Sequence, residues 1–514
     1  MTGKLLVGVD IGTTASKGVL VDVDGNVLAY QIREHAVSTP RPGWCEMDAD
    51  EVWWADLKFI LRGLVAQSGM DPKSIACVCV SALSPNLLPL DENDVPLCKG
   101  VIYSDMRAVA EIKEITDRLG EDRILRLMGR RIPPDSVGAK VLWLRKNEPK
   151  IFERTKIIHS ASSYLVFRLT GVHVMDTLSA NGVSPFYNPA TLSWDEEICR
   201  ELGISPDLFP PIKWTTEIAG SVTAEASRDT HLAEGTPVIV GFVDAPAESL
   251  STGAVAPWEA SLLYGTTMIM GIVVEPPKPG EKPLGNQMGV KGFYRTSVVM
   301  SSSGGLMRWF RDNFGQYEQE AEAKLGLSAY QLLAMGGESA PPGAEGLLVL
   351  PYFAGERSPI WDAQARGTVL GLTLSHSRMH IYRALVEATA FGLRHGLEVV
   401  QKTGVKVERV VSTGGGTKNH LWTQVVSDVL GRDQEILINA YGAPYGDAYL
   451  AGIGAGLFKD LVPLRDVWKR ETRVVRWSPE RNKLYDRYFE VYRGLYDKLK
   501  DSMHALAELA SLKV

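Results

Sequence analysis

Two short segments of this 514-residue chain repeat each other half a chain apart. Residues 11–22 read IGTTASKGVLVD and residues 264–275 read YGTTMIMGIVVE, so Gly-Thr-Thr, a later Gly, an aliphatic trio and an acid recur 253 residues on (264 − 11). Self-similarity at a fixed spacing indicates repeated structural units. Apolar residues flank each triplet and predict short strands. The sequence therefore predicts two lobes built on one plan, each opening with an antiparallel hairpin and a Gly-Thr-Thr turn.

The composition is that of a large folded protein, with 45% hydrophobic and 23% charged residues. The length favours two to four domains, or two large ones. The formal charge is −6, and Lys and Arg are spread along the chain, so neither a nucleic acid nor a membrane is expected as a partner. Five cysteines without a paired spacing, and no signal-like start, favour a reducing cytoplasm.

The first triplet follows an acid at the end of a predicted buried strand that runs from Leu5 to Asp10. Backbone N–H groups and threonine hydroxyls in such a turn suit phosphate oxygens, while the carboxylate suits a hard cation. A plain hairpin with a solvated Asp10 is the simpler alternative. The second triplet, Gly265-Thr266-Thr267, favours the phosphate interpretation, because two lobes could each offer one turn to the same polyphosphate.

Two further features could serve the same chemistry. No G-x-x-x-x-G-K-[ST] string occurs, so a nucleotide would be held differently from one in a P-loop. Gly414-Gly415-Gly416 lies between a predicted strand and a predicted helix, where backbone amides could approach a nucleotide or simply form a tight turn. Asp244 ends another predicted strand in a Gly- and Ala-rich context, a position from which a carboxylate could act as a general base.

Taken together, the motifs resemble those of the FGGY family of carbohydrate kinases, members of the actin-like ATPase superfamily, from about Leu5 to Leu457. No single string is decisive, but their order and spacing are shared with the family. In the first half they are Gly8-Val9-Asp10-Ile11-Gly12-Thr13-Thr14 with Lys17, Gly43-Trp44-x-Glu46-x-Asp48, Tyr103-Ser104-Asp105-Met106-Arg107, Lys140-Val141-Leu142-Trp143-Leu144 and Gly241-x-x-Asp244. In the second half they are Tyr264-Gly265-Thr266-Thr267, Gly304-Gly305, Gly367-x-x-x-Gly371-Leu372 with Glu387, and Gly414-Gly415-Gly416 through Asp428.

The resemblance implies an α/β protein with two ribonuclease-H-like lobes around a central cleft, and transfer of the γ-phosphate of ATP to a hydroxyl of a small sugar or polyol. It implies that Asp244 is the catalytic base, that Asp10 organises Mg²⁺, and that Asp105 and, less directly, Arg107 bind the acceptor. Around ATP it implies Thr13, Thr14, Lys17, Thr266 and Thr267 for the phosphates, and Gly304, Gly415, Gly416 and Asn419 for the nucleoside. Such a division suits phosphoryl transfer, which depends on positioning and charge neutralisation.

Departures from the family pattern concern the acceptor. Xylulokinase-like members carry G-Q-M-H-G where this chain has Ala82-Leu83-Ser84-Pro85-Asn86, and Ala245-Pro246 follows the predicted base where a polar residue is usual. A ketopentose remains the general expectation, but D-xylulose itself is disfavoured. The alternatives are another pentulose, a tetritol, a sugar acid or an open-chain acceptor such as that of the autoinducer-2 kinases.

Two functions of other classes also remain in view. An actin-like ATPase without sugar transfer would keep both Gly-Thr-Thr turns but would not need Asp244, and a catalytically lapsed sugar-binding protein would not need Asp244 either. The predicted domains are 1–250, with the acceptor site and the base, 251–460, with the nucleotide site, and 461–514, a helical extension packed on the second lobe. The sequence leaves the oligomeric state open, a homodimer included.

Overall fold

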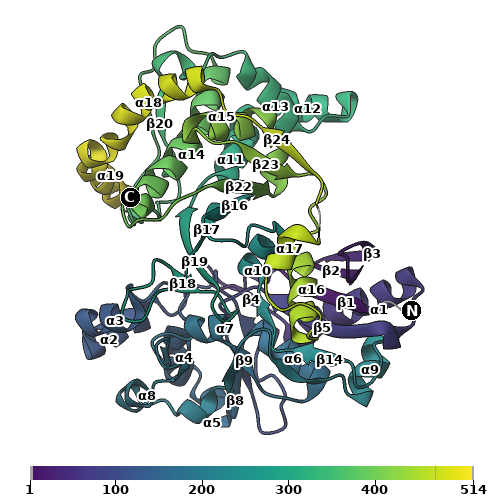
Figure 1. The fold of residues 1–514 in the computed structure, drawn as a ribbon. Helices are drawn as coiled ribbons and strands as arrows, with labels where there is room; N and C mark the ends of the chain where they lie inside the picture. The colour runs from purple at the N-terminus through teal and green to yellow at the C-terminus, as the bar shows by residue number, and fades with distance from the viewer. Residues whose placement is uncertain (1–3, 469, 512–514) are drawn as a thin grey trace. The chain divides into compact units, whose positions relative to one another are not determined.

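A computed structural model, which describes residues 4–468 and 470–511, divides the chain into two compact units (Figure 1). Unit 1 contains residues 4–251, 287–292 and 441–468, and unit 2 contains residues 252–286, 293–440 and 470–511. This division differs from the predicted ranges 1–250, 251–460 and 461–514, because the stretch after residue 440 first packs with unit 1. Residues 1–3, 469 and 512–514 of those ranges lie outside the described part.

Unit 1 is built on a sheet of the order β13-β14-β5-β1-β2-β3, with β15 also paired to β5. Strand β1 is buried along its whole length and pairs antiparallel with β2, which confirms the first predicted hairpin. On its other side β1 pairs parallel with β5. The strands are β1 (Leu5–Ile11), β2 (Ala15–Asp22), β3 (Val27–Glu34), β5 (Ile75–Ala82), β13 (Ile218–Ser221), β14 (Pro237–Ile239) and β15 (Phe242–Val243).

Two helices cover opposite faces of this sheet at its centre. A Cβ on Gly18 would lie 2.3 Å from Ile60 of α1 (Ala55–Ser68), and one on Gly8 would lie 2.0 Å from the Pro444 carbonyl of α16 (Ala443–Gly454). Both glycines are required because the backbone of α16 at Gly8, and the Ile60 side chain of α1 at Gly18, occupy the place of a Cβ. Figure 1 shows α16, which is late in the sequence, beside β1 and β5.

Unit 2 repeats the strand arrangement of unit 1. Strands β16 (Glu259–Tyr264), β17 (Met268–Val274) and β19 (Tyr294–Met300) form an antiparallel meander, and β22 (Arg409–Thr413) pairs parallel with β16. In unit 1, β1, β2, β3 and β5 have the same relations. The sheet continues through β23 (Gln434–Leu437) to β24 (Thr472–Val475). The internal repeat of the sequence therefore marks two structurally equivalent hairpins.

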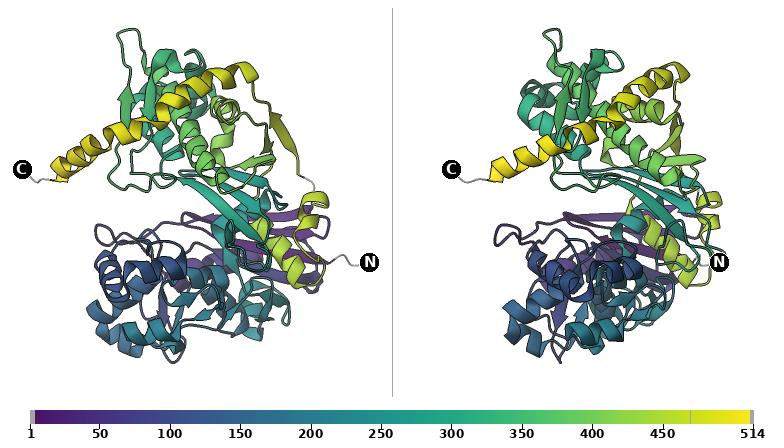
Figure 2. Two further views of the ribbon diagram at one scale, coloured as in Figure 1. Left: turned by 60° about the vertical axis from the view of Figure 1, so that its left-hand side comes forward. Right: turned by 90° about the vertical axis from the view of Figure 1, so that its left-hand side faces the viewer.

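The C-terminal helices pack on unit 2 and differ from the prediction in one respect. A single apolar stripe through Leu499 predicts one long helix after Pro479, but the structure has α18 (Pro479–Arg493) and α19 (Leu495–Ser511), which follow each other in yellow in both views of Figure 2. Gly494, the residue type with nearly the lowest helix propensity, separates them. Within residues 4–468 and 470–511, no helix combines the length and apolar character that crossing a membrane requires.

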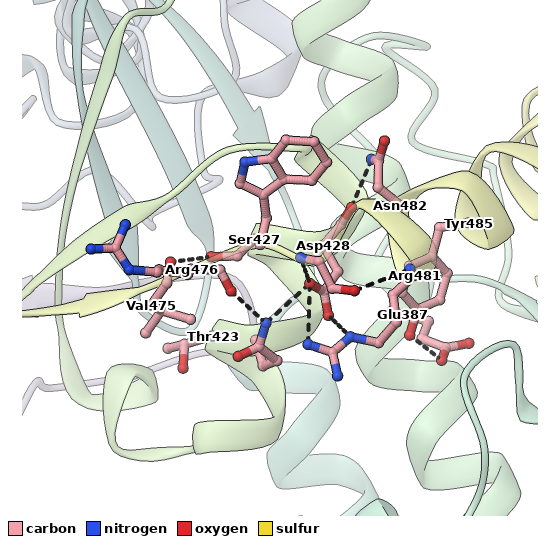
Figure 3. A network of polar contacts seen from close by, with 12 residues as sticks. Glu387, Thr423, Ser427, Asp428, Val475, Arg476, Arg481, Asn482 and Tyr485 are labelled. Atoms are coloured by element: carbon pink, nitrogen blue, oxygen red, sulfur yellow. Dashed lines mark hydrogen bonds and ion pairs between the residues drawn. The ribbon is translucent and has the colours of Figure 1, made fainter.

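Asp428 joins α18 to α15 (His420–Leu430), as Figure 3 shows. Its buried carboxylate accepts a hydrogen bond from the Ser478 N–H at 2.7 Å and pairs with Arg481 Nε at 2.6 Å. Asn482 donates to the Asp428 carbonyl at 2.7 Å. Asp428 therefore anchors the first turn of α18. The family motif that ends at Asp428 does not by itself predict these contacts.

Candidate active site

The first Gly-Thr-Thr turn joins β1 to β2 in unit 1. It closes with a hydrogen bond from the Gly12 N–H to the Ala15 carbonyl at 3.2 Å, and Thr14 at its tip is exposed. The Thr13 hydroxyl lies 3.3 Å from the Tyr103 hydroxyl. The described residues supply no backbone or side-chain acceptor for the N–H groups of Thr13 and Thr14. The turn thus offers amides and hydroxyls to a ligand rich in acceptors, such as a phosphate.

Asp10 lies just before this turn and is almost fully buried. Its carboxylate is 3.2 Å from the Ser81 hydroxyl, which lies closer, at 2.6 Å, to the carboxylate of Asp447 on α16. Burial, and then the nearby Asp244, raise the pKa of Asp10 well above its usual range. A buried carboxylate that is costly to ionise is stabilised strongly by a cation, so the residues at this site fit a hard metal ion.

Asp447 is fully buried and shares a single hydroxyl hydrogen with Asp10. Burial is the largest cause that raises its pKa well above the ordinary value. An acid whose pKa is raised on folding must take up a proton as it folds, and this costs stability as pH rises above the unfolded pKa of about 4.

We therefore expect Asp447→Asn to raise the Tm above that of the wild type at pH 8, and the difference to shrink as pH falls towards 4. The amide is neutral at every pH and retains groups that can hydrogen-bond Ser81. Thermal melts across that pH range, with the exposed Asp122→Asn as control, measure the effect. A Tm at or below the wild-type value at pH 8 would contradict the argument.

Asp244 begins α10 (Asp244–Ser251), directly after β15. Its Oδ1 accepts a hydrogen bond from the Ala245 N–H at 2.8 Å, and the residue is only half-buried. Burial outweighs this hydrogen bond and raises the pKa of Asp244 to about 7, with Glu248 contributing in the same direction. A general base works best when its pKa lies near the working pH, so this carboxylate suits proton abstraction.

Two charged side chains accompany these acids. Burial raises the pKa of Glu248 as it raises that of Asp10, and the charge of Lys17, opposite Asp10 in the β1–β2 register, opposes both shifts. Glu248 accepts a hydrogen bond from the Ala443 N–H at the start of α16, at 2.9 Å. Ser81, Glu248 and Asp447 are absent from the predicted site, because each lies in a segment whose small and apolar residues predict packing.

Asp105 and Arg107, the predicted acceptor ligands, are bound to each other. Oδ1 of Asp105 accepts from the Arg107 N–H and Nε at 3.0 and 2.8 Å, and Oδ2 accepts from the Cys45 N–H and Arg107 Nη2 at 2.6 and 2.7 Å. These four bonds fill the four lone-pair positions of a carboxylate. A direct bond from Asp105 to an acceptor hydroxyl would have to displace one of them, so that role stays a prediction.

Arg107 is held equally firmly. It pairs with Glu46 at 2.7 Å, and its guanidinium carbon lies 3.7 Å from the ring centroid of Trp44. Trp44 in turn meets Trp143 edge to face. The Asp105–Arg107 pair therefore fixes an aromatic wall, a positioning task that Lys cannot perform as well as Arg because the guanidinium is planar and stacks.

The loop 82–86, which departs from the family pattern, turns the side chain of Asn86 inward. Asn86 is buried, donates to the Leu83 carbonyl at 2.5 Å and accepts from the Ala161 N–H at 2.6 Å. Leu83 is fully buried as well. Of the loop residues 82–86, Ser84 is the polar side chain that remains outside the core.

The second Gly-Thr-Thr turn lies in unit 2, between β16 and β17. Thr266 is exposed, and the Gly265 N–H closes the turn on the Thr267 carbonyl at 3.1 Å. Helix α11 (Gly304–Phe314) begins behind it, and the Gly304 N–H is already bonded to the Gly265 carbonyl at 3.1 Å. Gly304 therefore supports the turn through its N–H. The side chain of Thr266 is exposed and that of Thr267 is partly exposed, so both are accessible to a ligand.

The glycine run in unit 2 follows β22 and leads into α15. Gly415 has open space where a Cβ would stand, whereas a Cβ on Gly416 would lie 2.6 Å from Trp422. Asn419 is buried, caps α15 by accepting from the Trp422 N–H at 3.0 Å, and donates to the Tyr382 hydroxyl at 2.9 Å. Gly415 is thus open to a ligand, and Asn419 has a structural task.

The structure groups the predicted site residues by unit. Asp10, Thr13, Thr14, Lys17, Asp105, Arg107 and Asp244 belong to unit 1, and Thr266, Thr267, Gly304, Gly415, Gly416 and Asn419 belong to unit 2. Among the described residues, no group of three or more His, Cys, Asp or Glu side chains could hold a metal ion by itself. A metal at Asp10 would need further oxygen ligands, such as those of a phosphate or water.

Comparison with known proteins agrees with these observations. Residues 5–250 match the N-terminal domain, and residues 260–455 the C-terminal domain, of the FGGY family of carbohydrate kinases. The chain is 28% identical over 508 residues to a xylulose kinase of Bacillus subtilis, covering 98% of this chain and 99% of that one. It is 28% identical over 445 residues to a gluconokinase of the same organism, covering 85% and 84%. The crystal structure of a xylulose kinase from Rhodospirillum rubrum, 28% identical, superposes with a TM-score of 0.87 over 98% of this chain and 100% of that one.

Proposed function

Because this chain belongs to the FGGY family of carbohydrate kinases and is an ATP-dependent sugar kinase, we propose that Asp244 is the base of its reaction. The acceptor hydroxyl gives its proton to the Asp244 carboxylate, the hydroxyl oxygen bonds to the γ-phosphorus, and ADP leaves with the electrons of the broken bond. The observation that carries this assignment is the half-buried Asp244 carboxylate at the start of α10, whose pKa is raised to about 7.

The remaining roles follow the chemistry of each side chain. Thr13, Thr14 and Lys17 at the first Gly-Thr-Thr turn, and Thr266 and Thr267 in the second, bind phosphate oxygens of ATP. Gly415, which is open, lies against the nucleoside, with Gly304, Gly416 and Asn419 shaping that region. Asp10 would hold Mg²⁺, and the ion would supply charge neutralisation at the phosphates. The free cysteines of the described residues suit a reducing cytoplasm as the compartment.

For the acceptor we infer a small, neutral, hydroxyl-rich ketose or polyol other than D-xylulose. The loop 82–86 turns Asn86 inward, and Ala245 beside the base has no polar side chain. Each acceptor hydroxyl left without a partner costs roughly 1–3 kcal/mol. Arg107 is already paired with the carboxylates of Asp105 and Glu46, and a carboxylate at the acceptor favours a neutral acceptor over an anionic one.

ADP release measured over D-xylulose, ribulose, erythritol, glycerol and gluconate tests both levels of this proposal. We expect stimulation by an acceptor, with the highest kcat/KM on a neutral compound other than D-xylulose. D-Xylulose or gluconate as the best acceptor would overturn the acceptor assignment and leave the kinase assignment intact. ATP hydrolysis that no acceptor stimulates would instead favour an actin-like ATPase without sugar transfer.

A further inference from the structure

Two carbonyl groups of the first Gly-Thr-Thr turn, those of Gly12 and Thr14, contact His35. His35 follows β3, and its backbone N–H donates to the Thr14 carbonyl at 3.0 Å. Its ring Nε2 lies 3.1 Å from the Gly12 carbonyl oxygen. The side chain is 7% exposed, so these contacts are shielded from water. One residue therefore holds both ends of the turn.

The ring of His35 is itself oriented by Asp56 of α1. Nδ1 lies 2.7 Å from Asp56 Oδ2, and the Asp56 side chain is 2% exposed. The same carboxylate accepts from the Ser16 hydroxyl at 2.7 Å and pairs with Arg33 at 3.1 Å. A backbone carbonyl oxygen can only accept hydrogen bonds. The contact of Nε2 with the Gly12 carbonyl therefore needs a hydrogen on Nε2, while Nδ1 faces the Asp56 carboxylate.

In the equivalent turn of unit 2, N–H donors also hold the carbonyl oxygens of the turn, but they come from other residues. The N–H groups of Ser303 and Gly305 donate to the Thr266 carbonyl at 3.2 and 3.0 Å, and the Gly304 N–H donates to the Gly265 carbonyl. These donors form the N-terminus of α11, the positive end of a helix dipole. In both units, donor groups behind the turn hold its carbonyl oxygens. His35 does in unit 1 what a helix terminus does in unit 2.

We propose that His35, oriented by Asp56, is a positioning residue that aims the Gly12-Thr13-Thr14 turn at the nucleotide phosphates. In a trans peptide the carbonyl and the following N–H point in opposite directions, so drawing the Gly12 carbonyl inward turns the Thr13 N–H outward. The inference rests on the proposed function in one respect, namely that this turn binds phosphate. His35 itself does not touch the ligand.

Amide substitutions separate the two ring contacts. In His35→Gln the amide nitrogen reaches the place of Nε2 and keeps a donor for the Gly12 carbonyl, whereas in His35→Asn the shorter amide serves only Asp56. We expect the KM for ATP to rise about tenfold in His35→Asn, the effect of one lost buried hydrogen bond, and less than threefold in His35→Gln. The KM for the acceptor stays unchanged in both variants.

Calorimetric titration with ATP, together with Tm, provides readouts that do not depend on turnover. The exposed neighbour variant Glu34→Gln, which leaves the His35 contacts intact, is expected to bind ATP like the wild type. Equal ATP affinity in His35→Asn, His35→Gln and wild type would overturn the proposal, as would equal weakening in both variants. A wild-type protein that binds ATP but phosphorylates no acceptor would instead refute the proposed function.

Discussion

Asp244→Asn is expected to lower kcat by about 10²–10⁴-fold, the usual contribution of general-base catalysis, while ATP affinity stays near that of the wild type. The asparagine amide has the size of the carboxyl group but cannot take a proton, so binding contacts survive and the chemical step does not. Turnover is measured by ADP release with the best acceptor, and ATP affinity by calorimetry. Asp122→Asn, an exposed position in unit 1, is the matched control. Near-wild-type kcat in a folded Asp244→Asn protein would remove Asp244 from the mechanism.

The same assignment fixes the direction of the pH dependence. Because the base must be ionised and its pKa is raised to about 7, the wild-type kcat/KM should fall tenfold per pH unit as pH drops well below 7. Activity should be independent of this group above pH 8. The residual activity of Asp244→Asn should lose the acidic limb. An acidic limb that persists unchanged in the variant would assign that ionisation to another group.

Asp10→Asn is expected to lower kcat/KM for Mg·ATP by about 10²–10³-fold, the size found when one preorganised electrostatic contact is removed from an active site. The substitution keeps the contact with Ser81 but removes the negative charge that faces the cation. The concentration of Mg²⁺ that gives half-maximal activity should rise at least tenfold, while the KM for the acceptor changes little. An unchanged Mg²⁺ dependence in a folded variant would show that Asp10 does not act on the metal.

Both hairpins follow from local patterns, and the structure confirms them. Each hairpin is encoded within about a dozen residues, which contain a short buried strand, a Gly-Thr-Thr turn and a second strand. Both turns could therefore be recognised from the sequence. The break between α18 and α19 was not predicted, because the apolar stripe continues through Gly494 and only the helix propensity of that glycine opposes it.

The supporting groups of the site were harder to predict, since they come from distant segments. His35 and Asp56 are 21 residues apart, and neither belongs to a recognisable motif, yet both meet beneath the first turn. Asp447 lies among small helical residues that indicate packing, and only the pairing of α16 with β1 and β5 brings it to Ser81. The motif around Asp105 located this residue. It did not reveal the four hydrogen-bond donors that already occupy the carboxylate.

During synthesis, β1 and β5 leave the ribosome long before the helix that covers them. All the strands of the unit 1 sheet lie before residue 250, but the face against which α16 packs stays open until Ala443–Gly454 has been made. Gly8 has no side chain to cover this face, and the Pro444 carbonyl of α16 lies 2.0 Å from where a Cβ would be. The first unit to be translated is therefore completed almost last, and a fragment that ends at residue 250 would expose an apolar sheet face to solvent and to other nascent chains.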